Sequence, residues 1–88
     1  MLRISRDEAM NGSVNVRLEG ALTGPWVEET KRVCETAAGR GDKLRLDLAG
    51  VSFADREGLK LLARLQKTNA VLKNCSAFLE AQLRSVQN

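Results

Sequence analysis

Apolar and polar residues alternate in three short stretches of the chain, and a period of two is typical of a strand with one buried face. Residues 2–5 predict a short edge strand, residues 14–19 a second strand, and residues 43–48 a third. A turn over residues 7–13, which contains an Asn-Gly pair, separates the first two stretches. Such turns join antiparallel neighbours, so we expect these two strands to form a hairpin.

A first amphipathic helix is predicted after a loop over residues 20–24. Pro25 stands at its first position, where the missing N–H of proline costs nothing. The apolar residues that follow fall on one arc at about 100° per residue. Gly39 and Gly41 are expected to end the helix, because glycine readily adopts the backbone conformation of a helix C-terminus. This helix should lie half-buried on the sheet.

A second helix, predicted over residues 56–68, has a wider apolar surface. Its apolar residues cover an arc of about 200°, whereas a helix on one sheet face needs about half of that. Leu61 and Leu65 form most of the surplus, which must meet a neighbouring helix or a partner. The same surplus would allow a homodimer through this helix. The polar stripe of the helix is almost wholly basic and consists of Arg56, Lys60, Arg64 and Lys67.

The C-terminal residues predict a short strand over residues 69–73 and a last helix that carries Phe78, Leu79 and Leu83, with Ser76 as its candidate cap. The resulting order of strands and helices predicts an α/β sandwich with a mixed sheet of about four strands. An N-terminal hairpin should be followed by parallel pairing of the last three strands, with right-handed crossovers and with helices mainly on one face. We expect one domain over residues 1–88.

Composition narrows the function. The chain has 88 residues, 14 basic against 11 acidic, and no histidine, which removes the commonest general base and metal ligand. It has no Gly-rich phosphate loop and no carboxylate pair with an obvious catalytic spacing. We therefore expect a non-enzymatic protein without catalytic residues, metal or cofactor. Without a signal core or an apolar run of membrane-spanning length, it should be cytoplasmic and not inserted in a membrane.

The two cysteines, Cys34 and Cys75, are far apart and show no metal-ligand spacing. Cys34 falls on the apolar arc of the first helix, where a buried, reduced thiol is expected. Cys75 precedes a helix start, a place where the pKa of a thiol can fall. With no neighbouring base or second cysteine, we expect an inert role for it.

The stretch from Leu44 to Leu65 is the most informative part of the chain, because a strand leads there through a short loop into the second helix. Asp55 is the predicted N-cap of that helix. Glu57 falls in the first turn, where a carboxylate stabilises a helix by about 0.3–1 kcal/mol. Asp47, at the strand end, has two open roles: it pairs with a nearby basic side chain or accepts hydrogen bonds from loop amides.

Residues 44–65 resemble the STAS domain, the fold of sulfate transporters and anti-sigma factor antagonists. The matching residues are Asp47, the run Gly50-Val51-Ser52-Phe53-Ala54-Asp55, Gly58 and Leu61-Leu62. Residues 18–22 and 71–76 resemble further strand and turn segments of the family. In members switched by a kinase, a serine just before the glycine is phosphorylated. Glu57 occupies that position here, and Arg56 replaces the other hydroxyl residue.

The resemblance implies a protein-binding regulatory module similar to an anti-anti-sigma factor, whose partner would be a kinase-type anti-sigma factor. Because Glu57 replaces the acceptor serine, no phosphosite is expected there and the domain should not be switched in the usual way. A second interpretation within the same fold is an accessory STAS subunit of a membrane transport complex.

The predicted partner-binding surface combines the loops at the carboxyl ends of the strands with the second helix. Its basic stripe is either a solvated helix face or a docking surface for an acidic partner. No aromatic residue is interleaved with it, so no nucleic acid is expected. Trp26 either covers the core or serves as an interface anchor. The predicted contact residues are Trp26, Ser52, Asp55, Arg56, Glu57, Gly58, Lys60 and Arg64.

Overall fold

The computed structural model describes residues 2–8, 12–39, 43–68 and 70–87. The predicted turn at Asn11, the helix stop at Gly41 and the strand start at Asn69 lie outside these ranges. The elements are β1 (Leu2–Glu8), β2 (Ser13–Leu22), α1 (Pro25–Gly39), β3 (Lys43–Ala54), α2 (Arg56–Gln66), β4 (Ala70–Lys73) and α3 (Ala77–Gln87).

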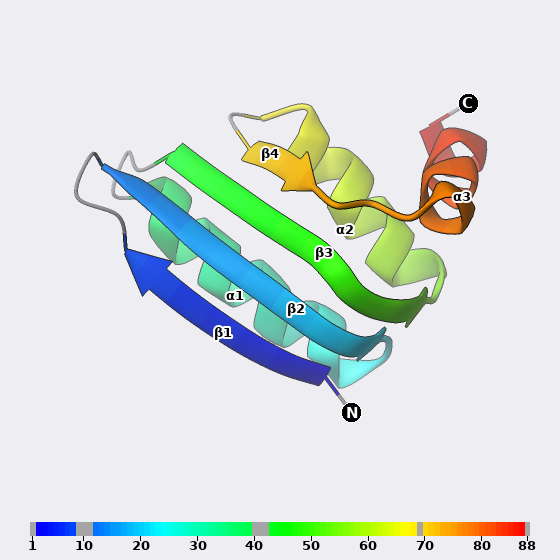
Figure 1. The fold of residues 1–88 in the computed structure, drawn as a ribbon, viewed down its shortest axis with the longest axis horizontal. Helices are drawn as coiled ribbons and strands as arrows, with labels where there is room; N and C mark the ends of the chain where they lie inside the picture. Colours follow the sequence, from blue (N-terminus) through cyan, green and yellow to red (C-terminus); the bar gives the residue numbers. More distant parts are fainter. Residues whose placement is uncertain (1, 9–11, 40–42, 69, 88) are drawn as a thin grey trace.

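The four strands form one mixed sheet in the order β1-β2-β3-β4. β1 pairs antiparallel with β2, whereas β2, β3 and β4 run parallel. In Figure 1 the helices α1 and α2 lie behind the sheet, and α3 lies at the side of α2. The other face of the sheet carries no helix among the described residues. This arrangement confirms the predicted α/β class, the N-terminal hairpin and the parallel pairing of the last three strands.

The core lies between the sheet and the helices. The alternating residues of β2 and β3 supply its sheet side, as their pattern predicts. Thr30 of α1 is fully buried, and its hydroxyl donates a 2.9 Å hydrogen bond to the carbonyl oxygen of Trp26, so its polar atom has a partner. The largest fully buried side chains are Leu18, Leu22, Leu46, Leu48, Leu62, Val14, Val16, Thr30 and Cys34.

Three strands are longer than the alternation predicts. β1 continues to Glu8, β2 to Leu22 and β3 to Ala54, so the predicted loop over residues 20–24 is wrong for its first three residues. The pairing of β2 with β3 shifts register twice, between Arg17 and Glu19 and again between Gly20 and Ala21, and continues to Leu22. Such shifts break the period of two without ending the pairing, which explains why the pattern did not reveal the strand ends.

The helices also differ in detail from the prediction. α2 ends at Gln66 rather than at Thr68. The amides of the next two residues, Lys67 and Thr68, each donate a 3.1 Å hydrogen bond to the carbonyl oxygen three residues earlier, which is a tighter pattern than that of an α-helix. Leu61 is only 5% exposed and Leu65 is partly buried, so the apolar surplus of α2 is covered within the domain. Phe78, expected among the apolar residues of α3, is 63% exposed. Ser76 caps α3 as predicted, since its hydroxyl accepts a 3.1 Å hydrogen bond from the amide of Leu79.

No helix formed by the described residues is long and apolar enough to cross a membrane.

Asp47 lies within the central strand β3 and contacts β2 and the residue that follows β4, and both of its expected roles are present. Its Oδ1 accepts hydrogen bonds from the Ala49 amide and from Asn74 Nδ2, both at 3.0 Å, and its Oδ2 lies 3.6 Å from Arg17 Nε. Asn74 holds the left-handed backbone conformation, φ 58°, which asparagine adopts more readily than most residues. These contacts, first the hydrogen bond from Asn74, hold the pKa of Asp47 below its usual value.

We expect Asp47→Asn to destabilise the domain in a pH-dependent way. A lowered pKa in the folded state stabilises the fold above the ordinary aspartate pKa of about 3.9, and this contribution is lost as the pH falls through the folded-state value. The difference in unfolding free energy between wild type and variant should therefore shrink as the pH drops below about 4. Urea unfolding across this range measures it, with Asp7→Asn as an exposed control on β1. A difference independent of pH would contradict the assignment.

Candidate functional site

Asp55 joins the two loops at the carboxyl ends of β2 and β3. Its Oδ1 accepts a 2.8 Å hydrogen bond from the Gly58 amide, which confirms Asp55 as the N-cap of α2. Its Oδ2 accepts a 3.0 Å hydrogen bond from the Gly24 amide, 31 residues earlier, just before α1. The Asp55 amide also donates to the carbonyl oxygen of Leu22 at 3.1 Å. One residue therefore fixes the starts of both helices relative to each other.

Gly58 is buried because the chain approaches it closely on the same side. A Cβ added there would lie 2.6 Å from the carbonyl oxygen of Leu22 and 3.3 Å from Asp55 Oδ1. Backbone cannot move away as a flexible side chain can, so only glycine fits. Its place just after Glu57 is therefore explained by packing against the β2–α1 loop, and its role is to position the loop.

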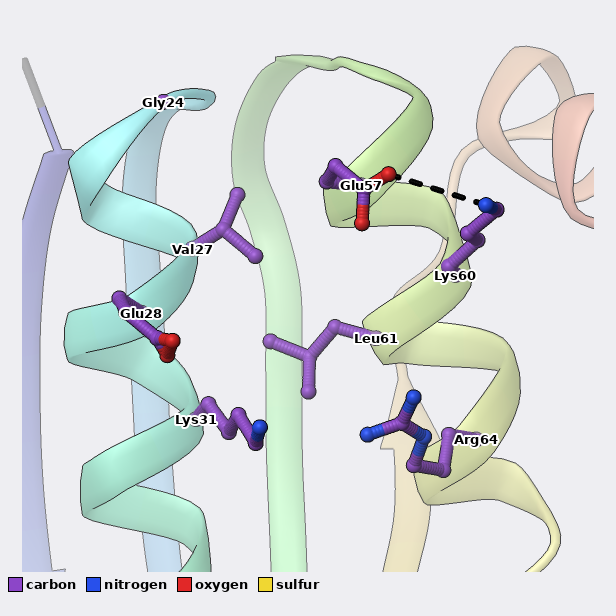
Figure 2. Close-up of a pocket in the computed structure, with 8 residues that line it drawn as sticks. All are labelled: Gly24, Val27, Glu28, Lys31, Glu57, Lys60, Leu61 and Arg64. Carbon is purple, nitrogen blue, oxygen red and sulfur yellow. Dashed lines mark ion pairs between the residues drawn. The ribbon is translucent and has the colours of Figure 1, made fainter.

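A groove of about 240 Å³ opens between α1 and α2, and Figure 2 shows its lining. Glu57 and Lys60 lie on the α2 side and form an ion pair, with 3.7 Å between Oε1 and Nζ. The Glu57 side chain is 71% exposed, so solvent screens this pair and it adds little to stability. The other lining residues are Gly24, Val27, Glu28, Lys31, Leu61 and Arg64.

The groove continues along the two helices into a smaller, more apolar hollow of about 150 Å³. Lys31, Leu61 and Arg64 line both parts, so the two hollows are contiguous. Leu65 and Cys34 line the apolar part. We call the two parts together the interhelical groove. It has a polar half near the Asp55 loop and an apolar half farther along α2.

Two cations face each other across the interhelical groove. Figure 2 shows Lys31 of α1 and Arg64 of α2 extending toward one another on either side of Leu61. Among the described residues neither has an ion-pair partner, although Glu28 lies on the same wall as Lys31. Two cations that line one groove without ion-pair partners favour an anion there.

The predicted contact residues occupy different places in this site. Glu57, Lys60 and Arg64 line the interhelical groove, whereas Asp55 and Gly58 form its support. The remaining three predicted residues do not line it: Trp26 is half-buried against the core, Ser52 is exposed within β3, and Arg56 is exposed at the start of α2.

Gly24 belongs to the loop over residues 22–26 that was predicted to contact a partner, but the sequence did not indicate the rest of the α1 wall, formed by Val27, Glu28 and Lys31. Helical periodicity placed Val27 with the core and Lys31 on the outer face. A residue at the boundary of the two faces can line an interhelical groove, but only the relative placement of the helices shows which one does.

The cysteines offer no reactive thiol. Burial and the nearby Glu35 carboxylate raise the pKa of Cys34 to about 11, in agreement with a buried, protonated thiol. The pKa of Cys75 is also raised, first by burial and then by Glu80. A fall in the pKa of Cys75 from the neighbouring helix start is therefore not what the structure shows, because both desolvation and a nearby carboxylate disfavour the thiolate.

We expect Gly58→Ala to lower the free energy of unfolding by about 1–3 kcal/mol through steric overlap with the Leu22 carbonyl. Without that overlap, alanine would be the better helix former by about 1 kcal/mol. Gly39→Ala is the matched control, since an added Cβ there meets nothing within 4 Å. Urea unfolding compares the three proteins. If Gly58→Ala is as stable as Gly39→Ala, the close approach does not constrain the loop.

The fold has solved counterparts, whereas no protein-family model and no curated protein matches the chain in sequence. The anti-sigma factor antagonist SpoIIAA, in its unphosphorylated form, superposes with a TM-score of 0.77 at 20% identity, over 93% of this chain and 82% of that one. An uncharacterized protein with a SpoIIAA-like fold from Shewanella loihica superposes with a TM-score of 0.57 at 13% identity, over 98% of this chain and 76% of that one. The chain therefore has a SpoIIAA-like fold, as its sequence predicted.

Proposed function

We propose that the domain is a non-enzymatic, protein-binding regulatory module similar to an anti-sigma factor antagonist. The observation that carries this proposal is the interhelical groove, which lies in a SpoIIAA-like fold beside the loop that Asp55 fixes. Open α/β sheets bind their ligands at the carboxyl ends of parallel strands, and the Asp55 loop lies at that edge. Its preformed geometry would let a partner bind without first ordering the loop.

Glu57 gives this module a permanent negative charge at the groove. One carboxylate supplies about one charge where a phosphoserine would supply about −1.5 to −2. Its ion pair with Lys60 further weakens the field of that charge. The carboxylate cannot accept a phosphoryl group as a serine would, so we infer that the module is not switched by phosphorylation at this residue.

The groove favours a protein partner that offers both an acidic and an apolar side chain. Lys31 and Arg64 would attract the acid, and the apolar half around Leu65 would take the apolar group. We propose a kinase-type anti-sigma factor as that partner, with Trp26, Ser52 and Arg56 as further contacts outside the groove.

The phosphorylation part of the proposal is tested with Glu57→Ser. We expect an anti-sigma factor kinase, recovered from source-cell extract and then purified, to bind wild type and to phosphorylate only the variant. Phosphate incorporation measured by intact mass would report it. A kinase that phosphorylates wild type elsewhere would contradict an unswitched module. Recovery of transporter subunits with both proteins would instead favour the accessory transport role.

The groove part is tested by reversing one charge. With the purified partner, we expect Arg64→Glu to weaken binding by at least about tenfold, because an acidic contact would then face a like charge. Arg84→Glu makes the same change at an exposed position of α3 and should leave the affinity nearly unchanged. Calorimetric titration measures both. Equal losses in the two variants would indicate a general charge effect and would remove the groove from the interface.

A further inference from the structure

The sheet has an open face, opposite the face that carries the helices (Figure 1), and a second hollow lies on it. Side chains of all four strands line a hollow of about 490 Å³, with Asn74 at its edge. We call it the sheet hollow. Three basic side chains, on Arg17, Arg45 and Lys73, face it against two acidic ones, on Asp7 and Asp47. Arg6 also borders the hollow, but it pairs with Glu8 at 3.1 Å, and its register partner is the buried Val16.

The carboxylate at the centre of the sheet hollow, on Asp47, already has three partners. Arg17 is the register partner of Asp47 on β2, and Lys73 is its partner on β4. Both oxygens of Asp47 have partners, since Oδ1 accepts from the Ala49 amide and from Asn74, and Oδ2 pairs with Arg17. Asp47 thus forms its ion pair with Arg17, and among the described residues it forms none with Lys73 or Arg45.

Arg45 is the cation that this arrangement leaves without a counter-charge. It lies on β3 two residues before Asp47, and its register partners are the neutral residues Asn15 and Val71. Its side chain is partly buried, yet within the described ranges it forms no ion pair. Lys73, diagonal to it on β4, has none either. Two cations on one concave face, one of them partly removed from water, favour an anionic ligand.

The lining limits what that ligand can be. It has no aromatic side chain on which a base could stack, and Val16, its one apolar residue, is fully buried. Protein interfaces are anchored by large exposed apolar or aromatic groups, which the hollow also lacks. Its size, by contrast, falls within the range of small-molecule sites, about 300–1,000 Å³. Arginine matches phosphate oxygens with two parallel hydrogen bonds, and asparagine and serine supply neutral donors and acceptors.

We propose that the sheet hollow binds a small phosphorylated polyol, such as a sugar phosphate. Arg45 and Lys73 hold the phosphate group. The hydroxyl groups of the ligand reach Asn15, Ser5 and the carboxylate of Asp7. The amide and the serine hydroxyl can donate or accept, whereas the carboxylate accepts a hydrogen bond that a ligand hydroxyl donates. This site lies on the opposite face of the sheet from the interhelical groove, so it does not depend on the proposed partner binding.

The test is a titration of the ¹⁵N-labelled full chain with glucose 6-phosphate, followed by amide chemical shifts. We expect saturable shifts at Asn15, Arg45 and Lys73, and none with glucose. Arg45→Gln should weaken binding by at least about tenfold, because it removes a charged donor from the phosphate. Arg3→Gln removes the same charge from the same sheet face outside the hollow and should leave the affinity within about twofold.

Three results would overturn the proposal. Shifts in the interhelical groove instead of the sheet hollow would place the anion site elsewhere. Equal weakening by Arg45→Gln and Arg3→Gln would show diffuse charge attraction rather than a site. Tighter binding of a hexaglutamate peptide at the same resonances would identify the hollow as a docking surface for acidic polypeptide. In each case Arg45→Gln is expected to bind the protein partner as wild type does, so the proposed function is tested separately.

Discussion

The carboxylate of Asp55 is the contact on which the arrangement of the site depends. A helix N-cap needs only one side-chain oxygen, and Asp55 uses its Oδ1 for the amide of Gly58. The second oxygen is free to reach Gly24, in a loop 31 residues away in the chain. An N-cap serine has a single side-chain oxygen, so it could accept from two donors only if both donors approached that same atom. Aspartate at this position therefore turns a local helix signal into a contact between two helix starts.

The close approach of the two loops follows from the same contact and explains the residues around it. With the β2–α1 loop drawn against α2, the Leu22 carbonyl lies where a side chain at residue 58 would be, so glycine is required. Glu57, one residue earlier, points away from this contact and into solvent at the groove. The packing of Gly58 and the exposure of Glu57 are thus two consequences of one loop geometry. A change of chemistry at residue 57 can occur without disturbing the loop.

The sequence predicted those parts of the structure that rest on local order. The alternation in β2 and β3, proline at the start of α1, and Asp55 and Ser76 as caps were all readable from neighbouring residues. Contacts between residues far apart in the sequence could not be predicted in this way. The link between Asp47 and Asn74 spans 27 residues, and no local pattern distinguishes it from the other expected roles of Asp47.

The candidate site shows the same division. Its α2 wall was predicted from the basic stripe, but its α1 wall was not, because Lys31 lies at the edge of the face that periodicity assigned to solvent.

The interhelical groove and the sheet hollow differ in what surrounds their positively charged side chains, and this difference bears on their roles. In the interhelical groove, Lys31 and Arg64 stand over an apolar floor and beside two carboxylates, Glu28 and Glu57. Such a mixed surface discriminates between partners by geometry and by apolar fit. In the sheet hollow the floor is polar, and Asp47 is fully engaged by neighbouring donors. The surplus charge there is carried by side chains on strands, whereas Lys31 lies within α1 and Arg64 in the last turn of α2. A polar and basic surface suits a small anion, whereas a groove with an apolar floor suits a protein side chain, so one small fold can keep two kinds of recognition on opposite faces.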